Sequence, residues 1–381
     1  MSHQDYVYDL GSSSTSKYRD YVIGIMSLWN RDLERLLGEK IVAARREKPR
    51  VERKLSDGHE VLGIRAYIIG SNILVRSPGG IEIPLRIAAN TGMAVKGDTV
   101  YLYMRLSSLG GHPIPNPWSR TFIGLAKTSL DKLYGSMKLE AKPILYPLLS
   151  TERVEDPRVD PDNMSELYHV RAYSTYKEVH GADSYVITFR SDIGNNGMPN
   201  NMEPVLFRTP DGSLHIIRSY RDTFPLNKEY MVTRPWIEEM SVGAIMIGPR
   251  EKNIVEAREL RTYPELTPTD SERKTGGNCT VKISSNEYLL FFHSVEAYFG
   301  GYYTYVAIMD GNGELLGMTP EPIISPRVND YIGARPATVF VCGAQLVGNK
   351  ILLTAGKDDE ITLVMEASLD SIIEKIKFIK G

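Results

Sequence analysis

An acid, a proline and an arginine stand together at residues 156–158, shortly before the strand-like run 167–173. Proline restricts the backbone and Asp-Pro pairs favour turns, so Asp156 is expected at a rigid corner where a strand begins. A carboxyl group fixed in this way can donate a proton to a leaving group. An ordinary surface turn is the competing interpretation, and other residues must decide between the two.

Polar side chains also stand at the ends of other predicted strands. A turn followed by an apolar strand with a polar last residue recurs at 96–105, 168–173, 210–218, 285–293 and 347–354. In a β-propeller, strand ends of this kind gather near one central axis, where a pocket can collect groups from distant parts of the chain. The candidate site residues are Asn90, Arg105, Asp156, Arg158, Arg218, Arg221, Lys274, His293, Tyr302 and Asp359.

One well-placed acid among several cations suits glycosyl transfer to or from an anion. A phosphorylase needs only the acid, because phosphate is the nucleophile and can be held by Arg, Lys and His. An inverting glycosidase needs a second carboxylate that activates water. The residue types alone leave both reactions open.

The segment that must position these residues runs from about residue 60 to 365 and reads as short strands separated by Gly, Pro, Asn and Asp. Because helices do not alternate with these strands, the sequence predicts an all-β architecture. Five repeating units fit the length as five four-stranded blades. The prediction is therefore a five-bladed β-propeller with an N-terminal helix, and a two-domain β-sandwich protein is the structural alternative.

The first fifty residues follow a different pattern. Residues 1–16 are polar with a Ser/Thr cluster, which predicts a disordered tail. Residues 17–47 carry apolar side chains at three- and four-residue spacing, which predicts one amphipathic helix within a segment 17–50. We expect this helix to contact the main domain or a partner subunit of a homo-oligomer. Residues 51–381 are then the catalytic propeller.

Composition limits the classes of function. The chain has 381 residues and a net charge of −2, so no basic surface indicates a nucleic-acid partner. No apolar run approaches the length of a membrane helix and no secretory signal pattern is seen, so a cytoplasmic protein without a membrane partner is expected. Only Cys279 and Cys342 are present, which excludes a disulfide framework and a cysteine metal site. No metal and no organic cofactor are predicted.

Six motifs in order resemble glycoside hydrolase family 130, the β-mannoside phosphorylases and related mannosidases. Residues 155–158 resemble its acid-bearing signature, 274–278 are similar to its Lys-x-Gly-x-Gly turn, and 289–295 resemble its apolar strand ending Tyr-His-Gly-Val. The other matches are a Pro-x-Pro step at 319–323, a Val-Phe-Pro-Cys-Gly step at 339–343 and an Ala-Asp step at 353–359, with 90–92, 103–105 and 122–126 fitting the first blade.

The resemblance, which spans roughly residues 85–370, implies a five-bladed propeller with a central pocket for a terminal β-mannosyl unit. It also implies an inverting reaction in which Asp156 is the general acid, directly or through a sugar hydroxyl. The residues implied to hold the sugar are Asn90, Arg105, Arg158 and Asp359. Inorganic phosphate would be the co-substrate, and the residues implied to hold it are Lys274, His293, Tyr302, Arg218 and Arg221.

Two departures from the family pattern concern phosphate. Where the family has a strand that ends His-Arg-Pro, residues 217–221 of this chain are Ile-Arg-Ser-Tyr-Arg. The segment 194–201 holds no cation, although the family pattern predicts a basic stretch there. The leading hypothesis is an inverting phosphorylase. The alternatives are an inverting hydrolase, with Glu178 or Glu296 as the base for water, and a carbohydrate-binding propeller without catalysis.

Overall fold

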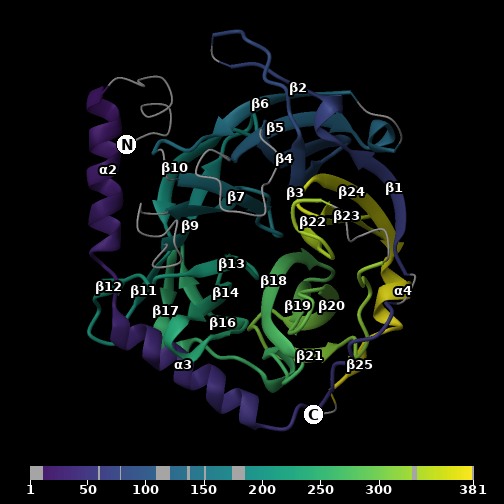
Figure 1. The fold of residues 1–381 in the computed structure, drawn as a ribbon. Coiled ribbons are helices and arrows are strands. Elements are labelled where there is room, and N and C mark those ends of the chain that lie inside the picture. Colours follow the sequence, from purple (N-terminus) through teal and green to yellow (C-terminus); the bar gives the residue numbers. More distant parts are fainter. Residues whose placement is uncertain are drawn as a thin grey trace.

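The computed structural model describes residues 12–58, 61–77, 79–108, 121–134, 138–149, 152–173, 185–327 and 333–379. Its strands form five sheets around a common centre, as in a β-propeller (Figure 1). The predicted all-β, propeller-like fold is confirmed. The alternative of two β-sandwich domains is wrong, because the innermost strands of all five sheets contact one another in a closed ring.

In each of the first three sheets, the spatial order of the strands from the centre of the ring to the rim is as follows. The first contains β3 (Ile87–Lys96), β4 (Thr99–Ser107), β5 (Phe122–Ser129), β6 (Leu139–Leu145) and β2 (Ile73–Val75). The second contains β7 (Glu152–Val159), β8 (Glu166–Tyr173), β9 (Tyr185–Ile193) and β10 (Pro199–Pro204). The third contains β13 (Tyr220–Pro225), β14 (Tyr230–Ile237), β16 (Met246–Glu251), β17 (Ile254–Glu256), β11 (Leu206–Arg208) and β12 (Leu214–His215), with β15 (Val242–Gly243) beside β14.

The last two sheets close the ring. The fourth contains β18 (Glu272–Lys282), β19 (Glu287–Glu296), β20 (Tyr302–Asp310), β21 (Leu315–Met318) and β25 (Lys377–Phe378). The fifth contains β22 (Val339–Val347), β23 (Lys350–Lys357), β24 (Ile361–Ser368) and β1 (Gly63–Ile68). Since β1 pairs with β24, strands from the two ends of the chain share one sheet. Among the described residues, only the second and fifth sheets have four strands, so the expectation of uniform four-stranded blades is wrong.

The inner strands share an irregularity that positions the candidate site. The pairing register shifts near the middle of β3, β7, β13, β18 and β22, which marks a β-bulge in each. In three of these bulges Asn90, Asp156 and Asp222 take left-handed backbone angles, with φ of 47°, 51° and 53°. Asn and Asp tolerate this conformation better than other side chains do. The predicted corner at Asp156 is therefore a bulge inside β7, and not a turn before a strand.

The N-terminal segment forms two helices where one is predicted. They are α2 (Ser12–Met26) and α3 (Arg31–Arg46), and a third helix, α4 (Leu369–Ile373), follows β24. The break occurs because Oδ1 of Asn30 caps α3 by accepting the Leu33 N–H at 2.9 Å, while the backbone of Asn30 donates to Ile216. Residues 12–16 are helical, so the predicted tail is too long; residues 1–11 lie outside the described part.

The apolar faces of these helices pack on their own chain. Tyr18 and Val22 of α2 and Leu33, Leu37 and Ile41 of α3 belong to the largest hydrophobic cluster, which also includes side chains of the second and third sheets. Figure 1 shows α2 and α3 along the outside of this part of the ring. No helix in the described ranges is long and apolar enough to cross a membrane.

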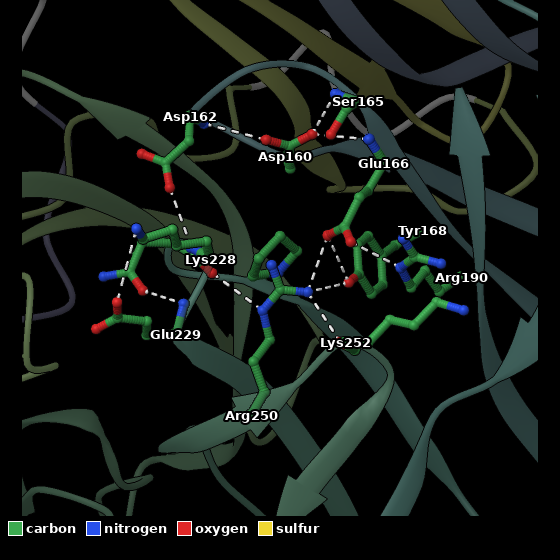
Figure 2. A network of polar contacts seen from close by, with 12 residues as sticks. Asp160, Asp162, Ser165, Glu166, Tyr168, Arg190, Lys228, Glu229, Arg250 and Lys252 are labelled. Atoms are coloured by element: carbon green, nitrogen blue, oxygen red, sulfur yellow. Dashed lines mark hydrogen bonds and ion pairs between the residues drawn. The ribbon is translucent and has the colours of Figure 1, made fainter. Parts of the chain in front are cut away.

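A polar network joins the second sheet to the third (Figure 2). The Glu166 carboxylate on β8 accepts hydrogen bonds from Nε of Arg190 at 2.7 Å and from Nη1 of Arg250, on β16, at 2.8 Å. Arg250 also donates to the Tyr168 hydroxyl at 2.5 Å. Beside this network, the Asp160 carboxylate accepts backbone N–H groups from residues 162–166 and orders the connection between β7 and β8.

Candidate active site

All five sheets contribute side chains to one cavity of about 270 Å³ among the inner strands. Eight of the ten predicted site residues line it: Asn90, Arg105, Asp156, Arg221, Lys274, His293, Tyr302 and Asp359. The cavity also has polar and aromatic side chains that the sequence did not single out, namely Ser107, Thr121, Arg153, Glu155, Asp222, Arg234, Arg335, Thr338 and Phe340.

The Asp156 carboxylate lies in a buried cluster of four polar side chains. Its Oδ1 accepts a hydrogen bond from Nδ2 of Asn90 at 2.8 Å and lies 3.4 Å from Nη1 of Arg105. The same two side chains reach Oδ1 of Asp359, at 3.3 Å and 3.1 Å. In the described part of the chain, Oδ2 of Asp156 has no hydrogen-bond partner, so it is the oxygen that can carry a proton for a substrate.

Arg105 keeps its charge within this cluster. Burial disfavours the guanidinium ion, but the carboxylates of Asp359 and Asp156 outweigh burial and raise its pKa above the ordinary value. A permanently charged, planar donor beside two carboxylates also has the geometry to bind hydroxyl groups of a sugar in a fixed orientation.

Glu155 precedes Asp156 and faces different partners. Its Oε2 accepts a hydrogen bond from Nη1 of Arg221 at 2.9 Å, and its Oε1 lies 3.7 Å from Nε of Arg153. Burial alone would raise the pKa of Glu155, but the neighbouring arginines, Arg221 first, lower it to about 2. A carboxylate held ionised in this way is a weak proton acceptor near neutral pH.

Besides Arg105 and Arg153, four cations belong to the described lining of the cavity, and two of these four, Arg221 and Arg234, have a carboxylate partner. Nε of Arg234 donates to Oδ2 of Asp222 at 2.6 Å, and Arg221 pairs with Glu155 as described above. Lys274 and Arg335, by contrast, have no ion-pair partner among the residues that the structure describes; both lie over the ring of Tyr302, at 5.5 Å and 4.9 Å from its centroid.

The cations repel one another across the cavity. Burial and the positive charges of Arg234 and Arg335 lower the pKa of Lys274 well below its ordinary value. A buried group of like charges is stabilised when an anion enters it, because the anion supplies the missing counter-charge. The arrangement therefore suits an anionic ligand.

His293 and Tyr302 complete this side of the cavity. The two rings stack with centroids 5.0 Å apart, and Nδ1 of His293 lies 2.6 Å from Oδ1 of Asn278. Burial lowers the pKa of His293 well below its ordinary value and raises that of Tyr302. Both side chains are thus neutral near pH 7.

Arg158, predicted to bind the sugar, does not line the cavity. It is 1% exposed, its Nη2 donates to Oδ1 of Asp222 at 2.8 Å, and its Nε donates to the Asn278 carbonyl at 2.6 Å. Its guanidinium also lies 5.3 Å from the ring centroids of both Phe224 and Phe340. The position of Arg158 therefore does not support direct sugar contact: past the bulge in β7 its side chain is buried and is not part of the cavity lining.

Arg218, predicted to bind phosphate, lies away from the cavity. Its backbone N–H donates to Glu34, and its guanidinium lies 4.7 Å from the ring centroid of Trp29, in the N-terminal segment. Arg218 was predicted because it ends the repeat at 210–218, but this repeat contains β12, which lies at the rim of the third sheet. The strand beside the innermost one is β14, and it contains Arg234.

Among the lining residues that sequence analysis missed, Arg234 and Asp222 have a signal in the sequence. Arg105 pairs with the residue before the bulge at Asn90, and Arg234 pairs with the residue before the bulge at Asp222. The stretch Asn227–Arg234 repeats the turn-and-strand pattern that ends at Arg105. Aligning the Asn or Asp of the inner strands would have identified Arg234 in place of Arg218.

Glu296, one of the two carboxylates predicted as a base for water, lies away from the cavity lining. Its carboxylate accepts the backbone N–H groups of Tyr298 and Phe299 at 2.7 Å and 2.6 Å. Its prediction as a base is therefore not supported by its position. Glu178 lies outside the described residues.

A family model described as beta-1,4-mannooligosaccharide phosphorylase matches residues 119–378. The protein is thus an enzyme of the glycoside phosphorylase or glycoside hydrolase class, and not a carbohydrate-binding module without catalysis. It belongs to glycoside hydrolase family 130, as its motifs predict. A comparison with curated proteins gives no match.

Solved structures share the fold at low sequence identity. A β-1,2-mannobiose phosphorylase from Listeria innocua is 17% identical with a TM-score of 0.56, over 77% of this chain and 92% of that one. A structure described with glycoside hydrolases that target β-1,2 mannosidic linkages in Candida mannan is 13% identical with a TM-score of 0.52, over 84% and 97%. A glycosyl hydrolase from Bacteroides ovatus has 13% identity and a TM-score of 0.50, over 84% and 94%.

Proposed function

We propose that the protein cleaves a terminal β-mannoside, or a closely similar glycoside, with inorganic phosphate and with inversion at the anomeric carbon. One observation carries this proposal: Asp156 shares its cavity with Lys274 and Arg335, two cations that lack an ion-pair partner in the described ranges. An acid and an unneutralised anion site in one cavity are what a phosphorolysis requires, with no organic cofactor.

In the proposed reaction, the sugar binds beside Asn90, Arg105 and Asp359. A phosphate oxygen, oriented by Lys274, Arg335 and Arg221, forms a bond to the anomeric carbon as the bond to the leaving sugar breaks. The proton of the Asp156 carboxyl passes to the leaving oxygen, directly or through a sugar hydroxyl. The products are a glycosyl phosphate of inverted configuration and the shortened sugar.

The described carboxylates favour phosphate over water as the nucleophile. Hydrolysis with inversion needs a second carboxylate that can accept a proton from water. In the described lining of the cavity, Glu155, Asp222 and Asp359 each lie within ion-pair distance of at least one arginine. For Glu155 and Asp222 the neighbouring arginines, Arg221 and Arg234 first, outweigh burial and lower the pKa, so these two carboxylates stay ionised and are weak bases for water.

We further propose that each of the five sheets is one blade, so that the ring is a five-bladed propeller. Supporting this count, β3, β7, β13, β18 and β22 contact one another in sequence around the ring. The additional strands of the first, third and fourth sheets then belong to the rim. An experimental structure with a different number of inner strands around the axis would contradict the count.

The reaction is tested by incubating the protein with a β-linked mannooligosaccharide in buffers with and without phosphate. We expect mannose 1-phosphate of the α configuration in phosphate buffer, and almost no cleavage without phosphate. Release of free mannose at equal rates in both buffers would instead identify an inverting hydrolase. Product configuration can be read by proton NMR before the free sugar mutarotates.

A further inference from the structure

The imidazole of His293 is held with one nitrogen bonded and the other unpartnered. Its Nδ1 lies 2.6 Å from Oδ1 of Asn278, and a carboxamide oxygen can only accept a hydrogen bond. Nδ1 must therefore carry the ring proton. Nε2 is buried and has no hydrogen-bond partner in the described part of the chain, so a neutral ring presents a lone pair there.

The surroundings keep this ring neutral. His293 is 1% exposed, and its burial disfavours the imidazolium ion; Asp222 opposes this effect, but the cations Lys274, Arg234 and Arg158 add to it. Asp222 is already bonded to Arg158 and Arg234, one on each carboxylate oxygen. A protonated ring would therefore add a further positive charge to a group of cations.

Packing also fixes the ring plane. His293 stacks on Tyr302 and meets the edge of Phe340, with centroids 5.0 Å and 5.1 Å away. The strand partner opposite is Gly276, where a Cβ atom would come within 2.6 Å of Cε1 and 2.9 Å of Nε2 of His293. Glycine at this position keeps the edge of the ring that carries Nε2 uncovered by a side chain.

We infer that Nε2 of His293 accepts a hydrogen bond from the anion itself, so that the cavity selects a tetrahedral oxyanion that still carries a proton. This inference rests on the proposed use of phosphate. Phosphate retains at least one proton at neutral pH, whereas sulfate, of the same shape, retains none. A sulfate oxygen would face the lone pair of Nε2, leaving a buried acceptor unpaired beside a negative charge.

The test compares the dissociation constants of phosphate and sulfate by calorimetry at pH 7 and constant ionic strength. In the unmodified protein, we expect phosphate to bind at least about tenfold more tightly than sulfate. In His293→Gln, the side-chain amide can donate to either anion, so the ratio should fall close to one. Equal affinities in the unmodified protein, or an unchanged ratio in the variant, would overturn the inference.

Lys274→Met is the matched control, because it removes a cation from the same cavity without touching His293. It should weaken both anions by similar factors and leave their ratio unchanged. Nitrogen-15 NMR of the histidines is a second measurement: the signal that disappears in His293→Gln should come from a ring protonated on Nδ1. A ring protonated on Nε2 would refute the inference.

The same data separate this inference from the proposed reaction. If phosphate supports glycoside cleavage but sulfate competes with it equally well, the role of His293 is wrong and phosphorolysis stands. If neither anion binds and cleavage proceeds equally without phosphate, both are wrong. Should His293→Gln fail to fold, the ratio measured in the unmodified protein decides the question by itself.

Discussion

At the scale of single residues, the Asp156 carboxylate has one oxygen bonded to Asn90 and Arg105 and one oxygen without a hydrogen-bond partner in the described part of the chain. In Asp156→Asn the hydrogen bond from Asn90 can persist, while the acidic proton is lost. We expect kcat to fall by at least about 100-fold and glycoside binding to remain, because general acids contribute about 10²–10⁴ in rate. Steady-state kinetics and calorimetry on the same preparation measure both quantities.

The leaving group provides a control for this role. An aryl β-mannoside with a nitrophenolate leaving group needs little protonation, so the loss in Asp156→Asn should be much smaller with this substrate. An equally large loss with both substrates would show that Asp156 acts in another way, for example by binding the sugar.

The lowered pKa of Lys274 predicts that phosphate binding depends on pH. Its folded pKa lies well below the ordinary value of lysine, so the ammonium loses its proton as pH rises through that lowered pKa. Phosphate binding should therefore weaken as the pH rises. This loss should occur at lower pH than the titration of an ordinary lysine, whose pKa is about 10.4. Measured KM values for phosphate should rise over this range. In Lys274→Arg the rise should disappear, because arginine keeps its charge; an identical profile would contradict the assignment.

At the scale of elements, the buried Arg158 connects the innermost strands of three sheets. It donates to the Asp156 carbonyl on its own strand β7, to Asp222 on β13 and to the Asn278 carbonyl on β18. Removing one partner of a buried ion pair costs about 3–5 kcal/mol. Arg158→Met should therefore lower the free energy of unfolding by this order, and lower kcat about tenfold at a temperature where the variant is folded.

Arg171→Met is a control that separates the loss of stability from the loss of kcat. Arg171 is also fully buried, pairs with Glu152 and lies 5.8 Å from the ring centroids of Tyr18 and Phe189, but it does not line the cavity or contact Asp156. Arg171→Met should lower the free energy of unfolding by an amount similar to Arg158→Met and leave the kinetics of the folded enzyme unchanged. If Arg158→Met retains normal kcat and KM, the link from Arg158 to the site is purely structural.

The contact between the second and third sheets predicts an acid-sensitive contribution to stability. Burial of Glu166 opposes its ionisation, but Arg250 and Arg190 lower its pKa below the ordinary value. A carboxylate with a lowered folded pKa stabilises the protein above its unfolded pKa of about 4.3, and the contribution is lost as pH falls through the folded pKa. Glu166→Gln should thus destabilise the protein at pH 7 by about 1–3 kcal/mol, and less at pH 3.

Denaturant unfolding at the two pH values measures this difference. Asp270→Asn is the control, since Asp270 pairs with Arg45 on the surface and its side chain is fully exposed. Exposed pairs contribute between about 0 and 1 kcal/mol. A Glu166→Gln effect as small as this, or one that does not change with pH, would show that the network of Figure 2 adds little to the junction of the sheets.

At the scale of the whole molecule, the two N-terminal helices belong to the same body as the ring. Their buried faces contact the second and third sheets, and Tyr18 of α2 donates to Glu152 at the start of β7 at 2.7 Å. The predicted contact with the main domain is therefore present. Contact with a second subunit, and with it the homo-oligomer, stays a prediction, as does a cytoplasmic location.

Local sequence patterns were enough to predict the all-β class, which the structure confirms, and to make Asp156 the leading candidate for the acid. Turn residues and strand patterns depend on neighbours along the chain, so they can be read locally. The family motifs likewise occupy short stretches. Of the ten candidate residues chosen at predicted strand ends, eight line one cavity.

Which polar strand ends meet depends on how distant strands pair in three dimensions. The patterns ending at Arg218 and Arg234 look alike in the sequence, but the first lies beside the rim strand β12 and the second at the cavity. Arg158 follows Asp156 by two residues and is nevertheless buried outside the cavity lining, because a bulge changes the direction of the side chains that follow. Strand order, register and bulges arise from pairings between distant segments, so a local pattern cannot specify them.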